Sequence, residues 1–239
     1  MENQIVISPI GHIRSDLKEK FGIPRQSGRA PSLVAEIVFE PNYRDPDFFR
    51  GIEGFSHLWL LFDFSLTRNR PVASTVRPPR LGGNKRVGVF ASRSPFRPNH
   101  IGLSCVRLER IERTSADGLV LVVSGADLLD GTPIFDVKPY LPLADCHTDA
   151  LGGYAAENDH LLQVEFPQDL LSKIPEEKRA GLCECLADDP RPSYQEDGRT
   201  YGMRFGDYEI KFTVAGDTLS VTDVYPFQEI EKTAGNAKS

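Results

Sequence analysis

The order of apolar and polar positions predicts mostly β-strands in the first 145 residues. Short apolar or alternating runs recur there between Gly, Pro and Asp, and helical periodicity is almost absent. The run Phe55–Phe64 is apolar on both faces after His57, which is typical of a central strand covered on each side. Further strands are expected at Gln4–Ile13 (Ile5 and Ile7 inward), Val34–Phe39, Arg86–Ala91, Leu103–Ile111, Leu119–Val123 and Ile134–Tyr140. This spacing favours an antiparallel barrel or sandwich.

The pattern changes near residue 145. Asp145–Asn158 is small, polar and rich in Gly, as expected of a linker. Beyond it we expect a strand at Leu161–Phe166, a helix at Pro175–Leu186 and a hairpin formed by Tyr208–Val214 and Leu219–Val224. The predicted fold is therefore mainly β. A small antiparallel β-barrel domain covers residues 4–145, a small α+β domain covers 159–230, and the tail from Lys232 is disordered.

Composition narrows the class of protein. The four cysteines form neither CxxC pairs nor a disulfide-rich pattern, so we expect a reduced protein without a metal site. The N-terminal residues lack the basic and apolar regions of a signal peptide, and no apolar run approaches the ~20 residues that span a bilayer. We therefore expect a cytoplasmic protein.

Charge is distributed unevenly along the chain. The net charge of all 239 residues is −6, yet Phe64–Leu108 contains nine Lys and Arg residues and no Asp or Glu. The rest of the chain carries a net charge of −15. A basic segment in an acidic protein predicts a local site for a polyanion.

No nucleotide-binding or hydrolase motif is present: GxGxxG after a strand, the Walker loop and GxSxG are all missing. Four polar clusters remain as candidate sites, namely Ser92–Asn99, Gly125–Pro133, Asp136–Tyr140 and Asp188–Tyr194. Each also has a purely structural interpretation, as a turn, a solvated sheet face or a helix end, and a histidine in the position of His57 is more often a core histidine than a catalytic one. The residues alone indicate a β-rich domain with a basic edge and identify no reaction.

These clusters carry a resemblance to the TrmO/TsaA family of tRNA methyltransferases. The matching stretches occur in order over about residues 5–145, which is more specific than any single motif. They include Lys20–Gln26, Gly54–Trp59, Thr75–Arg80, Gly88–Asn99, Asp127–Pro133 and Asp136–Pro142. The Asp189–Pro192 element resembles the C-terminal domain of the bacterial members. His100 departs from the family pattern, which has proline there, and this concerns only the local loop shape.

The resemblance implies a β-barrel that binds S-adenosyl-L-methionine and methylates N6 of threonylcarbamoyladenosine at position 37 of threonine tRNA. It also implies a homodimer that holds the cofactor near the subunit interface and binds the anticodon stem-loop. The implied cofactor contacts are Pro24, Arg25, Gln26, His57, Leu58, Arg93, Leu103, Asp127, Leu128, Leu129 and Asp130. The implied RNA contacts are Arg77, Arg80, Arg97, Asn99 and Arg191, and the implied catalytic residues are Asp136, Lys138 and Tyr140.

Two alternatives stay open at this point. The same barrel is equally suited to methylating another RNA base or a small molecule, and a non-enzymatic RNA-binding barrel explains the basic segment as well. The Pro24–Gln26, His57 and Asp127–Asp130 set favours a cofactor site. As the group that relieves positive charge on the attacking nitrogen, Tyr140 is preferred over Asp136.

Overall fold

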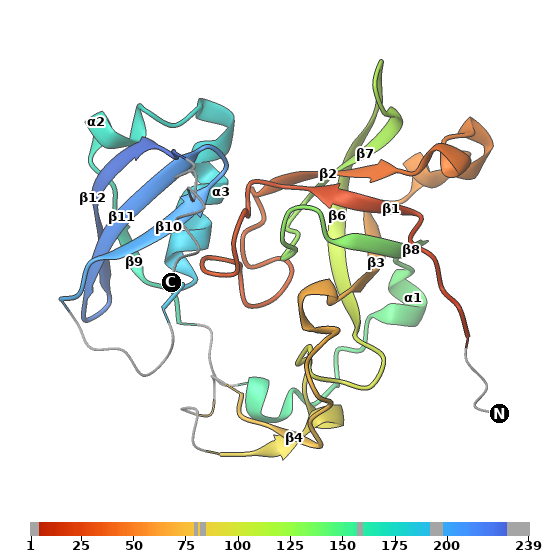
Figure 1. Ribbon diagram of the computed structural model, residues 1–239, viewed down its shortest axis with the longest axis horizontal. Helices are drawn as coiled ribbons and strands as arrows, with labels where there is room; N and C mark the ends of the chain where they lie inside the picture. The colour runs from red at the N-terminus through yellow and green to blue at the C-terminus, as the bar shows by residue number, and fades with distance from the viewer. Residues whose placement is uncertain (1–4, 79–80, 82–84, 157–159, 192–197, 229–239) are drawn as a thin grey trace, which may run out of the picture.

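Six antiparallel strands form a closed ring in the first part of the chain (Figure 1). The computed structural model describes residues 5–78, 81, 85–156, 160–191 and 198–228. Each strand of the ring is hydrogen-bonded to two others in the order β1-β2-β7-β6-β3-β8. The strands are β1 (Gly11–Arg14), β2 (Val34–Phe39), β3 (His57–Asp63), β6 (Ile101–Thr114), β7 (Gly118–Ser124) and β8 (Pro133–Pro139). The expected mainly β architecture is confirmed.

Strand β3 lies between β6 and β8, as its apolar sequence predicts. Leu58 and Leu60 point into the core of the ring and are fully buried. His57 and Trp59 alternate with them and are only partly buried. Side chains of β3 therefore alternate between the core of the ring and its outer face, to which β6 and β8 also contribute side chains.

Two strand predictions are wrong. The first strand begins only at Gly11, and Ile5 and Ile7 are 85% and 51% exposed rather than inward. Gly11 pairs with Phe39, the last residue of β2, so the ladder between β1 and β2 begins there, and Ile10 adds one backbone hydrogen bond each to Ile134 and Glu40. The expected strand Arg86–Ala91 is reduced to β5 (Val87–Gly88), which pairs with the equally short β4 (Thr75–Val76) and is followed by a 3₁₀ turn.

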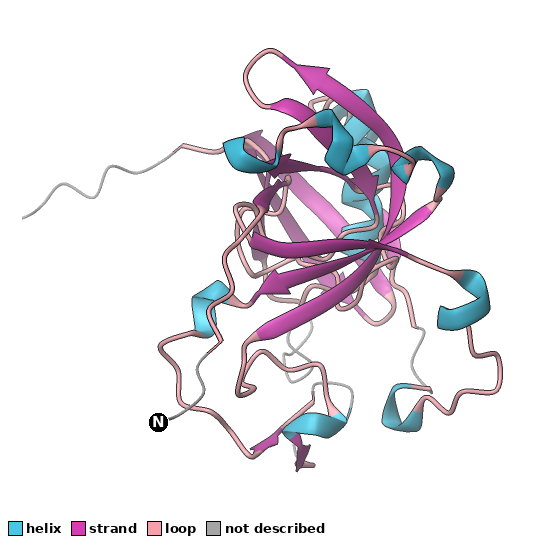
Figure 2. Ribbon diagram, turned by 90° about the vertical axis from the view of Figure 1, so that its right-hand side faces the viewer, coloured by secondary structure: helices cyan, strands magenta, loops and turns pink. Residues whose placement is uncertain are grey.

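Short helical turns surround the strands in the turned view (Figure 2). Three of these 3₁₀ turns, Pro41–Tyr43, Pro46–Phe49 and Ile52–Gly54, connect β2 to β3. The four-residue helix α1 (Pro142–Asp145) follows the ring, and the predicted linker follows α1. Among the described residues, no helix has the length and apolar character needed to cross a membrane.

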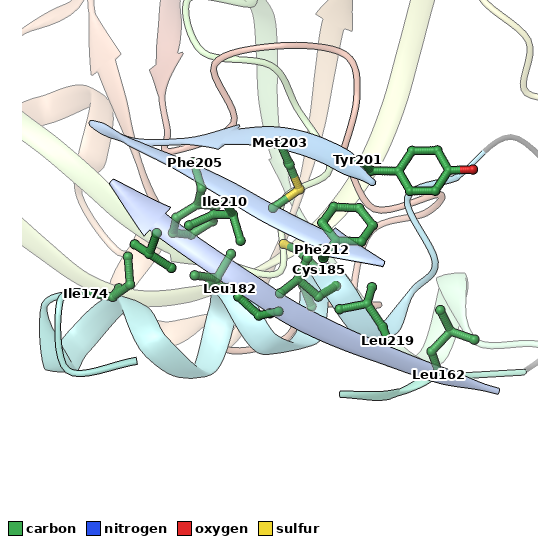
Figure 3. Packing of buried hydrophobic residues seen from close by; sticks show 14 of the residues in the cluster. Leu162, Ile174, Leu182, Cys185, Tyr201, Met203, Phe205, Ile210, Phe212 and Leu219 are labelled. Atoms are coloured by element: carbon green, nitrogen blue, oxygen red, sulfur yellow. The ribbon is translucent and has the colours of Figure 1, made fainter. Parts of the chain in front are cut away.

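The second part of the chain is a four-stranded sheet packed on a helix (Figure 3). The predicted hairpin and helix are confirmed, whereas β10 was not anticipated. The elements are β9 (Gln163–Glu165), α2 (Gln168–Leu171), α3 (Glu176–Ala187), β10 (Tyr201–Phe205), β11 (Tyr208–Ala215) and β12 (Thr218–Pro226). Leu182 and Leu186 on α3 and Phe212 on β11 are fully buried in the shared core. The expected disordered tail lies outside the described residues.

The segment between β1 and β2 belongs to the second core by its packing. Leu17, Ala30 and Leu33 are at most 2% exposed and join the apolar cluster of the C-terminal sheet rather than that of the ring. A backbone bridge joins Leu17 to Phe205 on β10. In Figure 1 this segment loops from the ring toward α3. Residues that precede β2 in sequence thus connect the two parts of the molecule.

Candidate functional site

A cavity of about 630 Å³ opens beside the ring, where four segments converge. Its walls come from Lys20–Gln26, from Phe62–Thr67 at the end of β3, from Ser92–Arg97 and from Asp127–Leu129. The first residues of β6, including Leu103 and Ser104, complete it. This volume suits a cofactor-sized ligand, and the walls combine apolar side chains with a few charged groups.

The Pro24–Gln26 wall is fastened to the C-terminal part of the chain. The Arg25 backbone N–H donates to Asp188 Oδ2 at 2.8 Å, and the Arg25 guanidinium donates to the Asp189 carbonyl at 3.0 Å. The Gln26 side chain contacts the Ser92–Asn99 loop instead, where its Oε1 accepts a hydrogen bond from the Arg93 guanidinium at 2.8 Å. Two arginines therefore stand at the cavity in fixed positions.

Short-range hydrogen bonds contribute most of the side-chain contacts that hold the Ser92–Asn99 loop. Ser92 Oγ donates to the Val89 carbonyl at 2.8 Å, and the Arg97 guanidinium donates to the Ser92 carbonyl at 3.0 Å. His100 ends the loop in the left-handed region at φ 47°. Proline cannot adopt that angle because its ring holds φ near −65°, so a relative with proline there has another local backbone.

Asp127 is a half-buried carboxylic acid that lines the cavity. Burial raises its pKa above the ordinary range, while the hydrogen bond from Ser104 Oγ and the charge of Arg93 act in the opposite direction. A buried carboxylate is costly unless it is paired, so this position favours a cationic or hydrogen-bond-donating ligand group.

Most of the expected cofactor residues line this cavity, but three do not. Those at the cavity are Pro24, Arg25, Gln26, Arg93, Leu103, Asp127, Leu128 and Leu129. Leu58 is fully buried in the ring core, and the Asp130 carboxylate accepts from the Ser15 N–H and from Lys18 Nζ. His57 lies on the outer face of β3 beside Tyr140. Within one chain, the structure therefore does not support cofactor contacts from these three.

The expected catalytic residues share the outer face of the ring and do not line the cavity. Lys138 Nζ pairs with Asp136 Oδ2 at 2.8 Å, and the Tyr140 ring lies 5.7 Å from that of Trp59. Desolvation, reinforced by the nearby Cys146 thiol, raises the pKa of Tyr140. Its phenol therefore stays protonated at neutral pH and does not act as a phenolate base.

This outer face adjoins the cavity through the strand register. Asp136 on β8 pairs with Leu61 on β3, and Leu61 pairs with Leu103 on β6. Leu103 lines the cavity. Two strand spacings separate Asp136 from Leu103, which corresponds to about 10 Å between their backbones. A substrate held against this face would thus reach the cavity edge.

The expected RNA contacts fall into four groups. Arg77 and Asn99 are exposed, and Arg97 lines the cavity. Arg80 lies outside the described residues. The Arg191 side chain is only 12% exposed, and its guanidinium bonds to both carboxylate oxygens of Asp189 at 2.9 and 3.1 Å. This position supports a structural role for Arg191 rather than direct contact with RNA.

Several cavity residues were not anticipated from the sequence. Phe62 and Phe64 contribute aromatic walls, and their rings meet edge to face with centroids 5.1 Å apart. Ser104 supports Asp127 from β6. These residues look like ordinary strand positions in the sequence, and only the way β3 and β6 end at the cavity makes them part of the site.

Comparisons with known proteins point to one family. The N-terminal domain model of tRNA-methyltransferase O matches residues 12–146, and the C-terminal domain model of the same protein matches residues 159–227. A tRNA (adenine(37)-N6)-methyltransferase of Escherichia coli is 42% identical over 227 residues, which cover 91% of this chain and 96% of the relative. A crystal structure of TrmO from Pseudomonas aeruginosa superimposes with a TM-score of 0.74 at 38% identity and covers 93% of this chain and 99% of that one.

The class that emerges is a methyltransferase built mainly on strands. A relative from Pseudomonas aeruginosa, 43% identical over 91% of this chain and 96% of its own length, is described as a putative S-adenosylmethionine-dependent methyltransferase. The chain belongs to the tRNA-methyltransferase O family. The family resemblance and the S-adenosylmethionine cofactor expected from the motifs are confirmed.

Proposed function

We propose that this chain uses S-adenosylmethionine to methylate N6 of adenosine 37 in tRNA, and that its substrate is the threonylcarbamoylated adenosine of threonine tRNA. The observation that carries the proposal is the cavity itself. It places Asp127, Arg25 and Arg93 around one apolar space, next to the basic Ser92–Asn99 loop. In this proposal the closed six-stranded sheet acts as a small barrel, and two copies form a cytoplasmic homodimer with the cavity near the interface.

The residues at the cavity fit the chemistry of S-adenosylmethionine. That cofactor carries a flat aromatic base, cationic groups and a carboxylate. Phe62 and Phe64 offer apolar surface for a base, and half-buried Asp127 offers the counter-charge for a cation. The guanidiniums of Arg25 and Arg93 are suited to a carboxylate. A volume of about 630 Å³ leaves room for a ligand of this size.

S-Adenosylmethionine supplies an activated methyl group when it is bound, so the task of the protein is mainly positioning. The cavity walls orient the ligand and exclude water. The outer face beside Leu103 would receive the target base, where Trp59 and Tyr140 offer rings for stacking.

The acceptor for positive charge at the attacking nitrogen is better assigned to Asp136 than to Tyr140. Tyr140 keeps its proton at neutral pH because its pKa is raised, whereas the Asp136 carboxylate has free acceptor capacity next to Lys138. In the proposal, Asp136 accepts a hydrogen bond from the N6–H group as charge develops there, and Lys138 holds that carboxylate in place.

The basic segment would bind the phosphates of the anticodon stem-loop. Arg77 and Lys85 are exposed on it, and Arg86 is tied to Thr75. Phe96, 38% exposed at the cavity edge, is placed to stack on a splayed base. Acidic surface elsewhere would discourage indiscriminate binding of RNA.

The test is methyl transfer from labelled S-adenosylmethionine to threonine tRNA prepared with and without the threonylcarbamoyl group. Label on the modified tRNA alone is the expected result. Label on both would remove the requirement for prior modification. Cofactor binding without label on either would support another acceptor, and tRNA binding without any cofactor binding would support a purely RNA-binding protein.

A further inference from the structure

We propose that Asp188, at the end of α3, is a positioning residue for the cofactor, through which the C-terminal part of the chain completes the cofactor cavity. The proposal rests on the assignment of S-adenosylmethionine to the cavity described above. Asp188 does not line that cavity itself. It acts through the Arg25–Arg29 segment, whose first residue does.

Both oxygens of the Asp188 carboxylate are used on this segment. Oδ2 accepts the backbone N–H of Arg25 at 2.8 Å, and Oδ1 accepts Arg29 Nε at 2.7 Å. The Asp188 side chain is 4% exposed and the Arg29 side chain 16%. Charge-assisted hydrogen bonds of this kind, sheltered from water, are stronger than surface ion pairs. They hold the backbone of a cavity residue across a sequence separation of 163.

The location of Asp188 is unfavourable for a carboxylate in local terms. Its N–H closes the last turn of α3 on the Glu184 carbonyl, so the negative charge stands at the negative end of the helix dipole. The next residue, Asp189, adopts the left-handed region at φ 52°. The Arg25 and Arg29 contacts offset these costs. Asp188 is therefore locally unfavourable at the end of α3, yet its carboxylate bonds to the Arg25–Arg29 segment. We infer that its function is to hold that segment in place.

From Asp188 the constraint extends into the cavity. Arg25 is held at its backbone by Asp188 and at its guanidinium by the Asp189 carbonyl. The neighbouring Gln26 in turn fixes the guanidinium of Arg93 at 2.8 Å. The two arginines that face the ligand space therefore depend on an anchor in the C-terminal part of the chain. Without that anchor, the Arg25 N–H loses its acceptor and the wall is free to shift.

A second carboxylate on α3 provides a matched control. Glu184 accepts the Ser32 N–H and the Ser32 Oγ–H, each at 2.7 Å, so it fastens the same segment to the same helix. Ser32, however, is not among the residues that line the cofactor cavity. A substitution at Glu184 weakens the connection between the two parts of the chain without releasing a cavity residue.

The experiment compares Asp188→Asn with Glu184→Gln in the full-length chain. The Asn side chain has one oxygen and one N–H₂ group, so its N–H₂ group faces either the Arg25 N–H or Arg29 Nε. Both groups are donors, and that hydrogen bond is lost. We expect the dissociation constant for S-adenosylmethionine, measured by calorimetry, to rise by about ten-fold or more in Asp188→Asn. It should change less than about two-fold in Glu184→Gln.

Steady-state kinetics separates positioning from general destabilisation. In Asp188→Asn the KM for S-adenosylmethionine should rise, while kcat at saturation and the KM for tRNA stay near wild type. Equal cofactor affinity in the two variants, whatever their melting temperatures, would show that Asp188 has only a structural role and would contradict the proposal. Should Asp188→Asn fail to fold, Asp188→Glu keeps the charge and displaces the oxygens, and unchanged affinity there would contradict it equally.

The wild-type chain distinguishes this failure from failure of the proposed function. Wild type that binds no S-adenosylmethionine would overturn the function and the inference together. Wild type that binds it, with both variants binding equally well, would leave the function intact and overturn only the role of Asp188.

Discussion

The two arginine-bearing segments at the cavity are held in different ways. Most side-chain hydrogen bonds of the Ser92–Asn99 loop join residues at most five positions apart, such as Arg97 to the Ser92 carbonyl, and its longer-range bonds run to Gln26, Thr67 and Ala73. The Arg25–Arg29 segment is held by Asp188 and by the Gly125 carbonyl, which lie about a hundred or more residues away. One wall of the cavity therefore rests mainly on short-range contacts, and the other depends on bonds to the distant C-terminal part of the chain.

This difference shows where the boundary of the site lies. The cavity opens beside the ring, yet the segment that carries Pro24–Gln26 is anchored by Leu17 and Leu33 in the core of the C-terminal sheet. A division of the chain near residues 146–159 separates the two sheets in sequence. It also separates the Pro24–Gln26 wall from the C-terminal residues that hold it, such as Asp188. Four predictions test this comparison.

Leu17→Ala should have the largest effect. It leaves a cavity in the C-terminal core and should lower the free energy of unfolding by about 2–5 kcal/mol. Because Leu17 anchors the cofactor segment, it should also weaken binding of S-adenosylmethionine. Leu121→Ala, equally buried but in the ring core, should cost a similar free energy without changing affinity. Denaturant unfolding and calorimetry check the pair, and equal loss of affinity in both would contradict the comparison.

Arg93→Ala should weaken cofactor binding by about ten-fold and leave the melting temperature almost unchanged, because the side chain is exposed and makes one side-chain hydrogen bond to Gln26. Arg86→Ala is its control, since Arg86 lies in the same basic stretch, contacts Thr75 and does not line the cavity. Unaltered affinity in Arg93→Ala would remove Arg93 from the site.

Asp127→Asn should stabilise the free protein while impairing cofactor binding. Burial raises the pKa of Asp127 in the folded chain, so the folded state binds this proton more tightly than the unfolded state. Stability therefore falls as pH rises from the unfolded pKa through the folded one. The amide removes that penalty, and the melting temperature should rise on the order of 2 °C at pH 7 and show no gain below about pH 3.5. A lower melting temperature at pH 7 would contradict this account.

Arg77→Ala should have the smallest effect and should act on RNA alone. It removes one exposed guanidinium from the basic segment, so the slope of log affinity for tRNA against log salt should become shallower by about 0.7–0.9. Affinity for S-adenosylmethionine should not change. Filter binding over a salt series measures the slope, and an unchanged slope would place Arg77 outside the RNA contact.

The features read correctly from the sequence are those with a local cause. The two-sided apolar run of β3, the strand β7 and the helix α3 that follows Pro175 are all predicted by neighbouring residues. The strand expected at Arg86–Ala91 is shortened to β5 because its partner β4 is only two residues long, which no local pattern reveals. Asp188 was likewise read as part of a helix exit, because its partners Arg25 and Arg29 are distant in sequence.

The site residues divide in the same manner. The family motifs lead to the cavity at Pro24–Gln26, Arg93 and Asp127, but they do not distinguish cavity positions from buried or outward ones. Leu58 alternates into the ring core, and His57 alternates out of it, because adjacent strand residues point to opposite faces. The Asp130 carboxylate forms an ion pair with Lys18 instead of lining the cavity. These outcomes depend on register and packing, which motifs alone do not contain.

The most direct test of the central claim is amide hydrogen exchange of the full chain with and without S-adenosylmethionine. The account predicts that the cofactor slows exchange in residues 20–29, 92–97 and 127–129, including the part of the segment that is anchored by Asp188. Residues 136–140 on the outer face should show little change. Protection confined to the outer face around His57 and Tyr140, with none at residues 20–29, would contradict the account and place the cofactor elsewhere.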